Sequence, residues 1–279
     1  MDIASISTGL SLDENGIWCS ASSKAISYPS DGNEACAIIE DGSFWFRHRN
    51  ACICALVSNY PPKNGGPVFD VGGGNGFVSR GLIRAGFDVV LVEPGPIGCL
   101  NAKNRGVRDV VCATTDNAGF IEKALPAVGL FDVIEHIEDD LMFLRSMHEL
   151  VEAGGCLYAT VPAYSALWSR EDDRAGHFRR YTLKSFSNIL TLAGFEVKFA
   201  TYIFRFLPIP ILLQRAIPYR LGLRKGGRSP SANSRDHSVG SRKTRSLLDA
   251  LFKSEIGNIN KRKTMFLGGS CLVVAKCVK

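Results

Sequence analysis

The stretch that decides the fold reads Val68-Phe69-Asp70-Val71-Gly72-Gly73-Gly74-Asn75-Gly76. An apolar run precedes the glycines, and a helix-like run from Phe77 to Ala85 follows them. A strand, a glycine-rich turn and a helix in this order form the first unit of a nucleotide-binding α/β sheet. We therefore expect residues 67–71 to be a strand of a parallel, doubly wound, Rossmann-like sheet.

The spacing of the glycines narrows the kind of nucleotide. Asp70 is followed by a glycine at every second position, namely Gly72, Gly74 and Gly76. A dinucleotide fingerprint counted from Gly72 needs glycine or alanine where Phe77 stands, and the Gly-Lys-Ser/Thr of a P-loop is absent from the sequence. The carboxylate of Asp70 would repel a pyrophosphate and attract a cationic group. The turn therefore favours a nucleoside ligand that carries positive charge.

The composition is that of a globular chain. Of its 279 residues 46% are hydrophobic, which is enough for a full core, and one domain with insertions is expected. The formal net charge of +6 favours anionic partners only weakly. The nine cysteines contain no C-x2-C pair, and the N-terminus lacks a signal-peptide pattern. We expect free thiols, a cytoplasmic location and no transmembrane segment.

Apolar segments alternate with helix-like segments along the chain. The expected strands are 67–71, 89–93, 107–112, 128–132, 156–161, 195–202 and 270–278. Residues 139–152 repeat apolar side chains at helical spacing, and Thr182 is a good N-cap for a helix that ends near Gly194. Strands separated by roughly 10–15 helical residues predict a parallel sheet, in which we expect the last two strands to be neighbours.

The chain divides into a core and additions to it. We expect a lead segment at 1–43, an α/β core at 44–202, an insertion at 203–269 and a final core strand at 270–279. The middle of the insertion, 226–240, is rich in Gly, Ser, Arg and Asn, which predicts a mobile loop.

Acidic side chains follow the expected strands. Glu93 ends the second strand, 17 positions after Gly76, where a carboxylate can accept both ribose hydroxyls of a nucleoside. Asp116 follows the third strand, where it could accept an adenine amino group or cap a turn. The fourth strand runs into Asp132-Val133-Ile134-Glu135-His136.

These motifs resemble the class I S-adenosylmethionine (SAM)-dependent methyltransferase superfamily. The resemblance rests on Asp70-x-Gly72-x-Gly74-x-Gly76, Glu93 and Phe131-Asp132-Val133-Ile134-Glu135-His136, and it covers roughly residues 44–202 and the final strand. It implies a seven-stranded sheet with an antiparallel last strand, and SAM as the cofactor. The implied cofactor-binding residues are Asp70, Gly72, Gly73, Gly74, Gly76, Glu93, Pro94, Asp116, Asp132, Glu135 and His136.

A bacterial subgroup of that superfamily is similar in two further stretches. These are Phe44-Trp45-Phe46-Arg47 and Trp168-Ser169 through Gly176-His177-Phe178-Arg179-Arg180-Tyr181. The aromatic stretch is expected to be a lid or a helix packed on the sheet, with Arg47 and Arg49 turned outwards. Residues 202–213 are expected to form a buried cap, with a wall of the acceptor pocket or a bilayer contact as alternatives.

Methyl transfer needs a positioned nucleophile and, for a hydroxyl or amine, the removal of its proton. His177 is the first candidate for the general base, because histidine ordinarily exchanges protons near neutral pH. The alternative for His177 is a structural hydrogen bond. Asp172, Asp173 and Tyr181 are weaker candidates for the base.

The expected acceptor is a small or conjugated metabolite, with anionic, sugar and lipid-linked compounds among the candidates. Trp168, Arg179 and Arg180 are assigned to its binding, although either arginine could simply be solvated. Nucleic acid is disfavoured, because the chain has neither a Pro-Cys nucleophile nor an Asn/Asp-Pro-Pro-aromatic element after the fourth strand. Peripheral membrane contact stays open.

Competing interpretations involve other chemistry. Asp132, Glu135, His136 and His177 could together hold a metal ion, as a magnesium-dependent RNA-ribose methyltransferase would require, but we expect no metal. A non-catalytic SAM-binding module is a further alternative. A nicotinamide-dependent oxidoreductase is disfavoured by Asp70 and Phe77.

Overall fold

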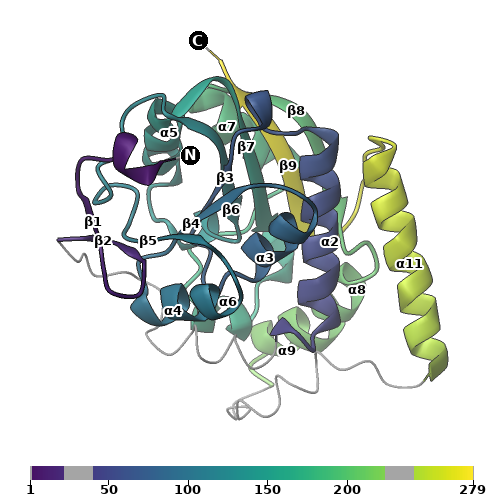
Figure 1. Cartoon of the computed structure of the whole chain (residues 1–279). Coiled ribbons are helices and arrows are strands. Elements are labelled where there is room, and N and C mark those ends of the chain that lie inside the picture. The colour runs from purple at the N-terminus through teal and green to yellow at the C-terminus, as the bar shows by residue number, and fades with distance from the viewer. Residues whose placement is uncertain (1, 22–39, 224–241, 279) are drawn as a thin grey trace.

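The computed structural model describes residues 2–21, 40–223 and 242–278, and its centre is one mixed sheet (Figure 1). The strands are β1 (Leu10–Leu12), β2 (Trp18–Ser20), β3 (Val68–Val71), β4 (Val89–Val92), β5 (Asp109–Cys112), β6 (Leu125–Phe131), β7 (Val151–Pro162), β8 (Phe195–Ile203) and β9 (Ser270–Cys277). Their order across the sheet is β1-β2-β5-β4-β3-β6-β7-β9-β8. Strands β3 to β7 pair in parallel, and β9 is antiparallel to both β7 and β8. The antiparallel final strand and its pairing with β8 confirm two expectations.

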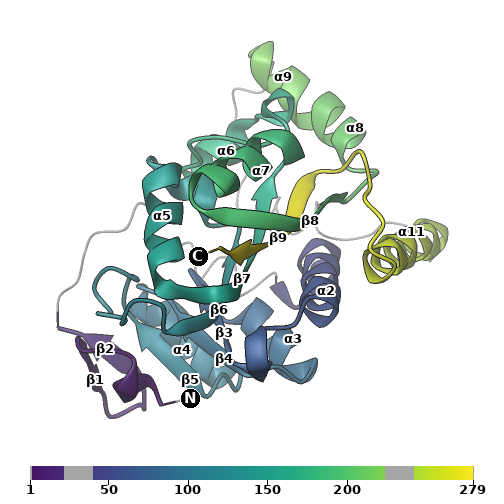
Figure 2. The same cartoon turned by 90° about the horizontal axis from the view of Figure 1, so that it is seen from above.

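Helices connect and cover the strands. The helices are α2 (Phe44–Asn59), α3 (Phe77–Arg84), α4 (Pro96–Asn104), α5 (Asp140–Leu150), α6 (Arg170–Ala175), α7 (Leu183–Leu192), α8 (Pro208–Ile211), α9 (Ile217–Arg220) and α11 (Arg242–Asn260). Short turns of helix are η1 (Ile3–Ser5), η2 (Lys63–Gly65), η3 (Ile134–His136), η4 (Ser165–Leu167) and the π turn η5 (Leu212–Ala216). Helix α5 lies on one side of the sheet and α2 and α3 on the other, with α11 alongside α2 (Figure 2). None of the helices in the described ranges combines the length and apolar character that a bilayer crossing requires.

Two differences from the expected sheet have physical reasons. The sheet has nine strands among the described residues, not seven, because the hairpin β1–β2 adds to its edge by parallel pairing of β2 with β5. These strands have only three residues each, too few for a clear alternating pattern. Helix α5 is also shorter than expected, because the chain turns directly into β7 at Val151.

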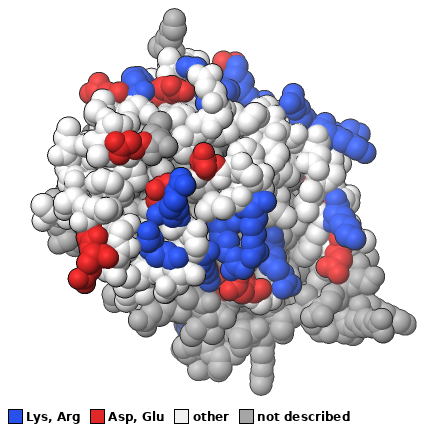
Figure 3. Space-filling model, viewed as in Figure 1, with Lys and Arg blue, Asp and Glu red and all other residues white. Residues whose placement is uncertain are grey.

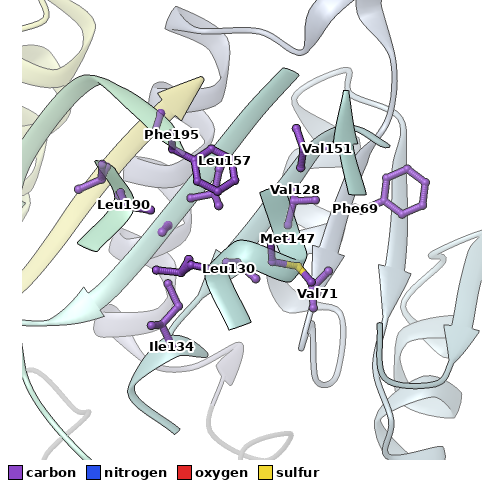
Figure 4. Packing of buried hydrophobic residues seen from close by; sticks show 14 of the residues in the cluster. Phe69, Val71, Val128, Leu130, Ile134, Met147, Val151, Leu157, Leu190 and Phe195 are labelled. Atoms are coloured by element: carbon purple, nitrogen blue, oxygen red, sulfur yellow. The ribbon is translucent and has the colours of Figure 1, made fainter. Parts of the chain in front are cut away.

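The core fills both faces of the sheet. Met147 of α5 and Leu190 of α7 lie among strand residues such as Val71, Leu130 and Leu157 (Figure 4). A second buried cluster lies between the sheet, α2, α3 and α11. Strands β3, β4 and β6 are buried along their whole length, which explains why their sequences are apolar except for Asp70 in β3.

Other expectations meet the structure in part. Thr182 caps α7 as expected, and Ser43 caps α2 by accepting from the backbone of Trp45 and Phe46. The cysteines at described positions are free thiols. Residues 226–240, the expected mobile loop, lie outside the described residues.

Candidate active site

A cavity of about 730 Å³ opens at the carboxyl ends of β3, β4, β5 and β6. Its wall contains the glycine turn, the tips of the neighbouring strands, the loop after β7 and part of α2. In open α/β sheets ligands bind at this edge, and cavities of about 300–1,000 Å³ are usual for small molecules. The cavity is therefore the candidate site.

The glycine turn uses the conformational freedom of its glycines. Gly72, Gly74 and Gly76 have φ values of +69°, +53° and +73°, which side-chain-bearing residues rarely adopt. A Cβ at Gly72 would lie 2.8 Å from Val133. Gly72, Gly73 and Gly74 line the cavity, as expected. Gly76 does not line it: a Cβ there would lie 2.8 Å from the Cβ of Ala102, so this glycine allows close packing on α4.

Glu93 is fixed at the tip of β4. Its Oε2 accepts a hydrogen bond from the backbone N–H of Gly74 at 3.0 Å, and its Oε1 accepts one from Gly95 at 2.9 Å. A carboxylate oxygen has more than one acceptor site, so both oxygens can still accept from ribose hydroxyls. Pro94 lines the cavity beside it.

The residues after β5 differ from expectation. Ala113, Thr114 and Thr115 line the cavity, whereas Asp116 is exposed and is not part of the lining. Three residues separate Asp116 from the end of β5, and the chain has turned away from the cavity by then. The expected adenine contact of Asp116 is therefore not supported by its position.

Asp70 is buried beneath the glycine turn. Ser79 donates a hydrogen bond to its Oδ2 at 2.6 Å. Burial raises the pKa of Asp70 to about 6, although the hydrogen bond from Ser79 and the nearby Arg49 act in the opposite direction. The carboxylate of Asp70 is thus mostly ionised at neutral pH, although its burial makes the ionised form less favourable in the folded chain than in water.

Arg49 points into the molecule, so the expectation that it turns outwards is wrong. It is 8% exposed, lies over the ring of Trp45 at 4.7 Å and pairs through Nη1 with Asp132. The reason is helical spacing: Arg49 shares the sheet-facing side of α2 with Trp45 and Ile53. Within the described ranges its Nε has no hydrogen-bond partner. Arg47, by contrast, is exposed as expected.

Asp132, directly after β6, is the partner of Arg49 in the ion pair. It has a positive φ of 58° at the end of the strand and accepts a hydrogen bond from Thr160 Oγ1 at 2.9 Å. Asp132 and Arg49 both line the cavity. The pair links the helix that precedes the core to the strand that carries the acidic motif.

Glu135 and His136 follow in η3 and also line the cavity. Glu135 is 1% exposed, and among the described residues nothing hydrogen-bonds to its Oε2. Burial, followed by the neighbouring charge of Asp132, raises the pKa of Glu135 well above its usual range. Burial and then His177 lower the pKa of His136 to about 4. The ring of His136 is therefore neutral at pH 7.

His177 is held against the cavity by its own loop. Its Nδ1 lies 2.9 Å from Oδ1 of Asp172, and Arg180 donates to both oxygens of the same carboxylate at 2.7 and 3.0 Å. Burial raises the pKa of Asp172, but the bonds from His177 and Arg180 outweigh it and hold the pKa at about 2. Asp172, His177 and Arg180 all line the cavity. His177 therefore both makes the structural hydrogen bond, to Asp172, and lies at the cavity where a general base would be needed.

Four other predicted residues do not reach the cavity lining. They are Trp168, Asp173, Arg179 and Tyr181. Asp173 accepts from Trp168 Nε1 at 2.9 Å and from Tyr219 at 2.7 Å. Arg179 and Tyr181 both bind Asp140, at 2.7 Å each. These side chains hold the loop between β7 and α7 in place, because their polar groups bind Asp140, Tyr219 and, for Trp168 and Asp173, each other.

A possible ligand set for a cation also lies in the cavity. Glu135, His136 and His177 each offer one atom that could bind a metal, and these three atoms lie within 4.8 Å of one another. Asp132, the fourth residue of that interpretation, is instead paired with Arg49. The expectation of a metal-free site stays a prediction.

The glycine turn, the acid at the tip of β4 and the acidic motif after β6 thus meet at one cavity of a doubly wound sheet. This is the class I SAM-dependent methyltransferase fold, with SAM as its cofactor. Residues 45–198 match the methyltransferase domain family, and the chain belongs to that family.

Individual relatives agree with this class. The ubiquinone biosynthesis O-methyltransferase of Azorhizobium caulinodans is 32% identical over 101 residues, which are 34% of this chain and 40% of that protein. Its counterpart from Cereibacter sphaeroides is 29% identical over 101 residues, 34% of this chain and 41% of that protein. The match thus spans about two fifths of the length of these relatives.

Solved structures share the fold at low identity. Phosphoethanolamine N-methyltransferase 2 of Haemonchus contortus, in complex with SAM, has a TM-score of 0.54 and 17% identity, covering 90% of this chain and 58% of that one. A SAM-dependent methyltransferase from Archaeoglobus fulgidus has a TM-score of 0.51 and 16% identity, covering 81% and 94%.

Proposed function

We propose that the chain transfers the methyl group of SAM to a hydroxyl oxygen of a small-molecule acceptor. One observation carries this proposal: a single cavity is lined both by the nucleoside-type residues Gly72–Gly74 and Glu93 and by His177, which is tied to a buried carboxylate. The O-methyltransferase names of the curated relatives support the choice of oxygen.

The lining residues fit the parts of SAM. Glu93 would accept from the ribose hydroxyls, since its two oxygens are oriented by Gly74 and Gly95. Asp70 and Asp132 supply negative charge for the cationic groups. The buried Nε of Arg49 is a hydrogen-bond donor without an acceptor among the described residues. It would donate to the carboxylate of the methionine moiety of SAM. When bound, SAM supplies a methyl group already activated by its sulfonium.

His177 would act as the general base. A carboxylate can only accept, so Nδ1 of His177 carries the proton in its bond to Asp172, which leaves the lone pair on Nε2. Nε2 would take the proton of the acceptor hydroxyl. Asp172 would stabilise the imidazolium that forms, and Arg180 keeps Asp172 ionised.

The acceptor side of the cavity is mixed in character. Leu207, Pro210 and Ile211 give it an apolar wall, while Gln214, Arg215 and Arg180 add polar groups. We propose an acceptor with an apolar body and an anionic or hydroxylated part, such as a conjugated sugar or a lipid-linked metabolite.

Calorimetry with SAM and S-adenosylhomocysteine tests the cofactor half. Wild type should bind both, and Gly74→Arg should bind neither, because a side chain is strained at this φ and would fill the cavity. Gly86→Arg is the control, since Gly86 also has a positive φ but no neighbour within 4 Å and no part in the lining. Absence of binding by wild type would overturn the proposal.

A magnesium-dependent transfer to a ribose hydroxyl is the second candidate. The cluster of Glu135, His136 and His177 favours it. Turnover abolished by a chelator and restored by magnesium would establish this candidate. Turnover unchanged by the chelator would exclude the magnesium-dependent reaction and support the mechanism in which His177 is the general base. Binding of SAM without turnover of any acceptor would instead indicate a non-catalytic module.

A further inference from the structure

The helical segment after β8 exposes a stripe of apolar side chains. Helix α8, the π turn η5 and α9 follow one another without a break from Pro208 to Arg220. Ile209, Leu213, Ile217 and Leu221 recur at every fourth position and are 62%, 58%, 36% and 64% exposed. Residues four apart lie on one side of a helix, so these side chains form one continuous apolar surface.

The inner side of the same segment belongs to the cavity. Pro210, Ile211, Gln214 and Arg215 contribute to its lining. The segment is thus a wall with the cavity on one side and the apolar stripe on the other. A partner bound to the stripe would therefore lie about one helix diameter, about 10 Å, from the cavity.

The charge of this segment has one sign. Residues 203–223 contain Arg205, Arg215 and Arg220 and neither Asp nor Glu. Basic side chains also gather near the middle of the face shown in Figure 3, but acidic ones lie among them. Among the basic residues outside this segment, Arg80 pairs with Asp41 and Arg105 with Glu40. The segment after β8 thus combines an apolar stripe with a sequence whose charged residues are all basic.

The loop before β9 extends the surface. Phe266 is 90% exposed and Leu267 47%, and Lys261 and Lys263 in the same loop are also exposed. The end of this loop packs on the start of the helical segment, since a Cβ at Gly269 would lie 3.6 Å from Leu207 and 3.9 Å from Ile211. Apolar and basic side chains therefore adjoin in two segments far apart in the sequence.

We propose that this surface, made of 205–221 and 261–267, binds an anionic phospholipid bilayer. The apolar side chains would enter the boundary between headgroups and acyl chains. The exposed Arg205, Arg220, Lys261 and Lys263 would meet the lipid phosphates. A second copy of the chain is a poorer occupant, because a two-fold interface would bring the same cations against one another.

The bilayer would then lie beside the wall of the cavity. If the chain is the methyltransferase proposed above, its acceptor is an amphiphile that resides in or at the membrane. The binding of the surface to lipid does not itself depend on that activity.

Flotation with vesicles tests the surface. The full chain should float with vesicles of equal parts phosphatidylcholine and phosphatidylglycerol, less with pure phosphatidylcholine, and less at high salt. The double variant Ile209→Ser/Leu213→Ser should lower partitioning by about tenfold or more, because each substitution removes an exposed apolar side chain that would enter the bilayer. The control is Leu192→Ser on α7, which is 65% exposed and lies outside the surface. It should float like wild type.

Three results would overturn the proposal. The first is that the wild-type protein does not float with anionic vesicles, and the second is that the double variant floats as well as wild type. The third is that sedimentation velocity without lipid shows a dimer of the wild-type protein and no dimer of the double variant. Calorimetry of SAM on the same samples separates the two proposals. SAM binding without flotation contradicts only the surface, and flotation without SAM binding contradicts only the proposed activity.

Discussion

Asp172 accepts a hydrogen bond from His177 at 2.9 Å while its other oxygen receives Arg180 at 3.0 Å. One buried carboxylate thus orients the imidazole and is itself kept ionised. This arrangement allows two questions to be tested independently. They are the proposed proton-accepting role of His177 and the stability of the loop that holds it.

Replacement of His177 tests its role as the base. His177→Asn should lower kcat by about 10²–10⁴-fold at an identified acceptor, as expected for loss of a general base. Its affinity for SAM should stay within about threefold, because the ring is on the acceptor side. Release of S-adenosylhomocysteine measures turnover. His148→Asn on α5, remote from the cavity, is the matched control. Unchanged kcat in His177→Asn would remove His177 from the mechanism.

The stability contributed by Asp172 should depend on pH. Its pKa is about 2 in the folded chain, below the ordinary value of 3.8, so its ionised form stabilises the fold. That contribution, about 2 kcal/mol, should be complete above pH ~4 and be lost as the pH falls toward about 2. Urea unfolding of wild type and Asp172→Asn across this range measures it. A constant gap between the two would show that the carboxylate gains nothing from its partners.

Asp70 should show the opposite sign. Burial raises its pKa to about 6, so the ionised form destabilises the fold at neutral pH. Asp70→Asn should therefore raise the free energy of unfolding by about 3 kcal/mol above pH ~6.5. The gain should vanish below pH ~4, where the carboxyl is protonated in both states. Thermal or urea unfolding measures it. A variant less stable than wild type at pH 8 would show that the bond to Ser79 outweighs the burial.

Arg49 should recognise only one end of SAM. Arg49→Met should weaken SAM and S-adenosylhomocysteine by about 10–100-fold through loss of a charged hydrogen bond. It should leave 5′-methylthioadenosine, which lacks the amino-acid end, nearly unchanged. Calorimetry with the three ligands measures the difference. Arg47→Met, on the exposed side of α2, is the matched control. An equal loss for all three ligands would assign Arg49 a purely structural role.

The sequence predicts the geometry of the glycine turn and the position of Glu93, for local reasons. The positive φ values at Gly72, Gly74 and Gly76 and the strand-end position of Glu93 follow from short motifs whose geometry depends on neighbours in the chain. The ends of parallel strands then bring those motifs together without any further information.

The loop that carries His177 depends on contacts between distant segments, so the sequence does not predict where all of its side chains lie. Arg179 and Tyr181 lie in the same stretch as His177 and Arg180, yet they turn to Asp140, about forty positions earlier. Nothing in the spacing of these four residues distinguishes the two pairs. The expectation that Arg49 turns outwards overlooks its spacing from Trp45 and Ile53, which places the three residues on one side of α2.

The position of β9 between β7 and β8 bears on how the molecule is made. Among the strands that the structure describes, β8 pairs with β9 alone, and residues 204–269 are synthesised between the two. Until then the apolar edges of β7 and β8 remain unpaired, a state that favours aggregation. The glycine turn can form early on the ribosome, whereas the sheet beneath His177 closes only when residues 270–277 arrive. Loss of those few residues should therefore be far more damaging than their number suggests.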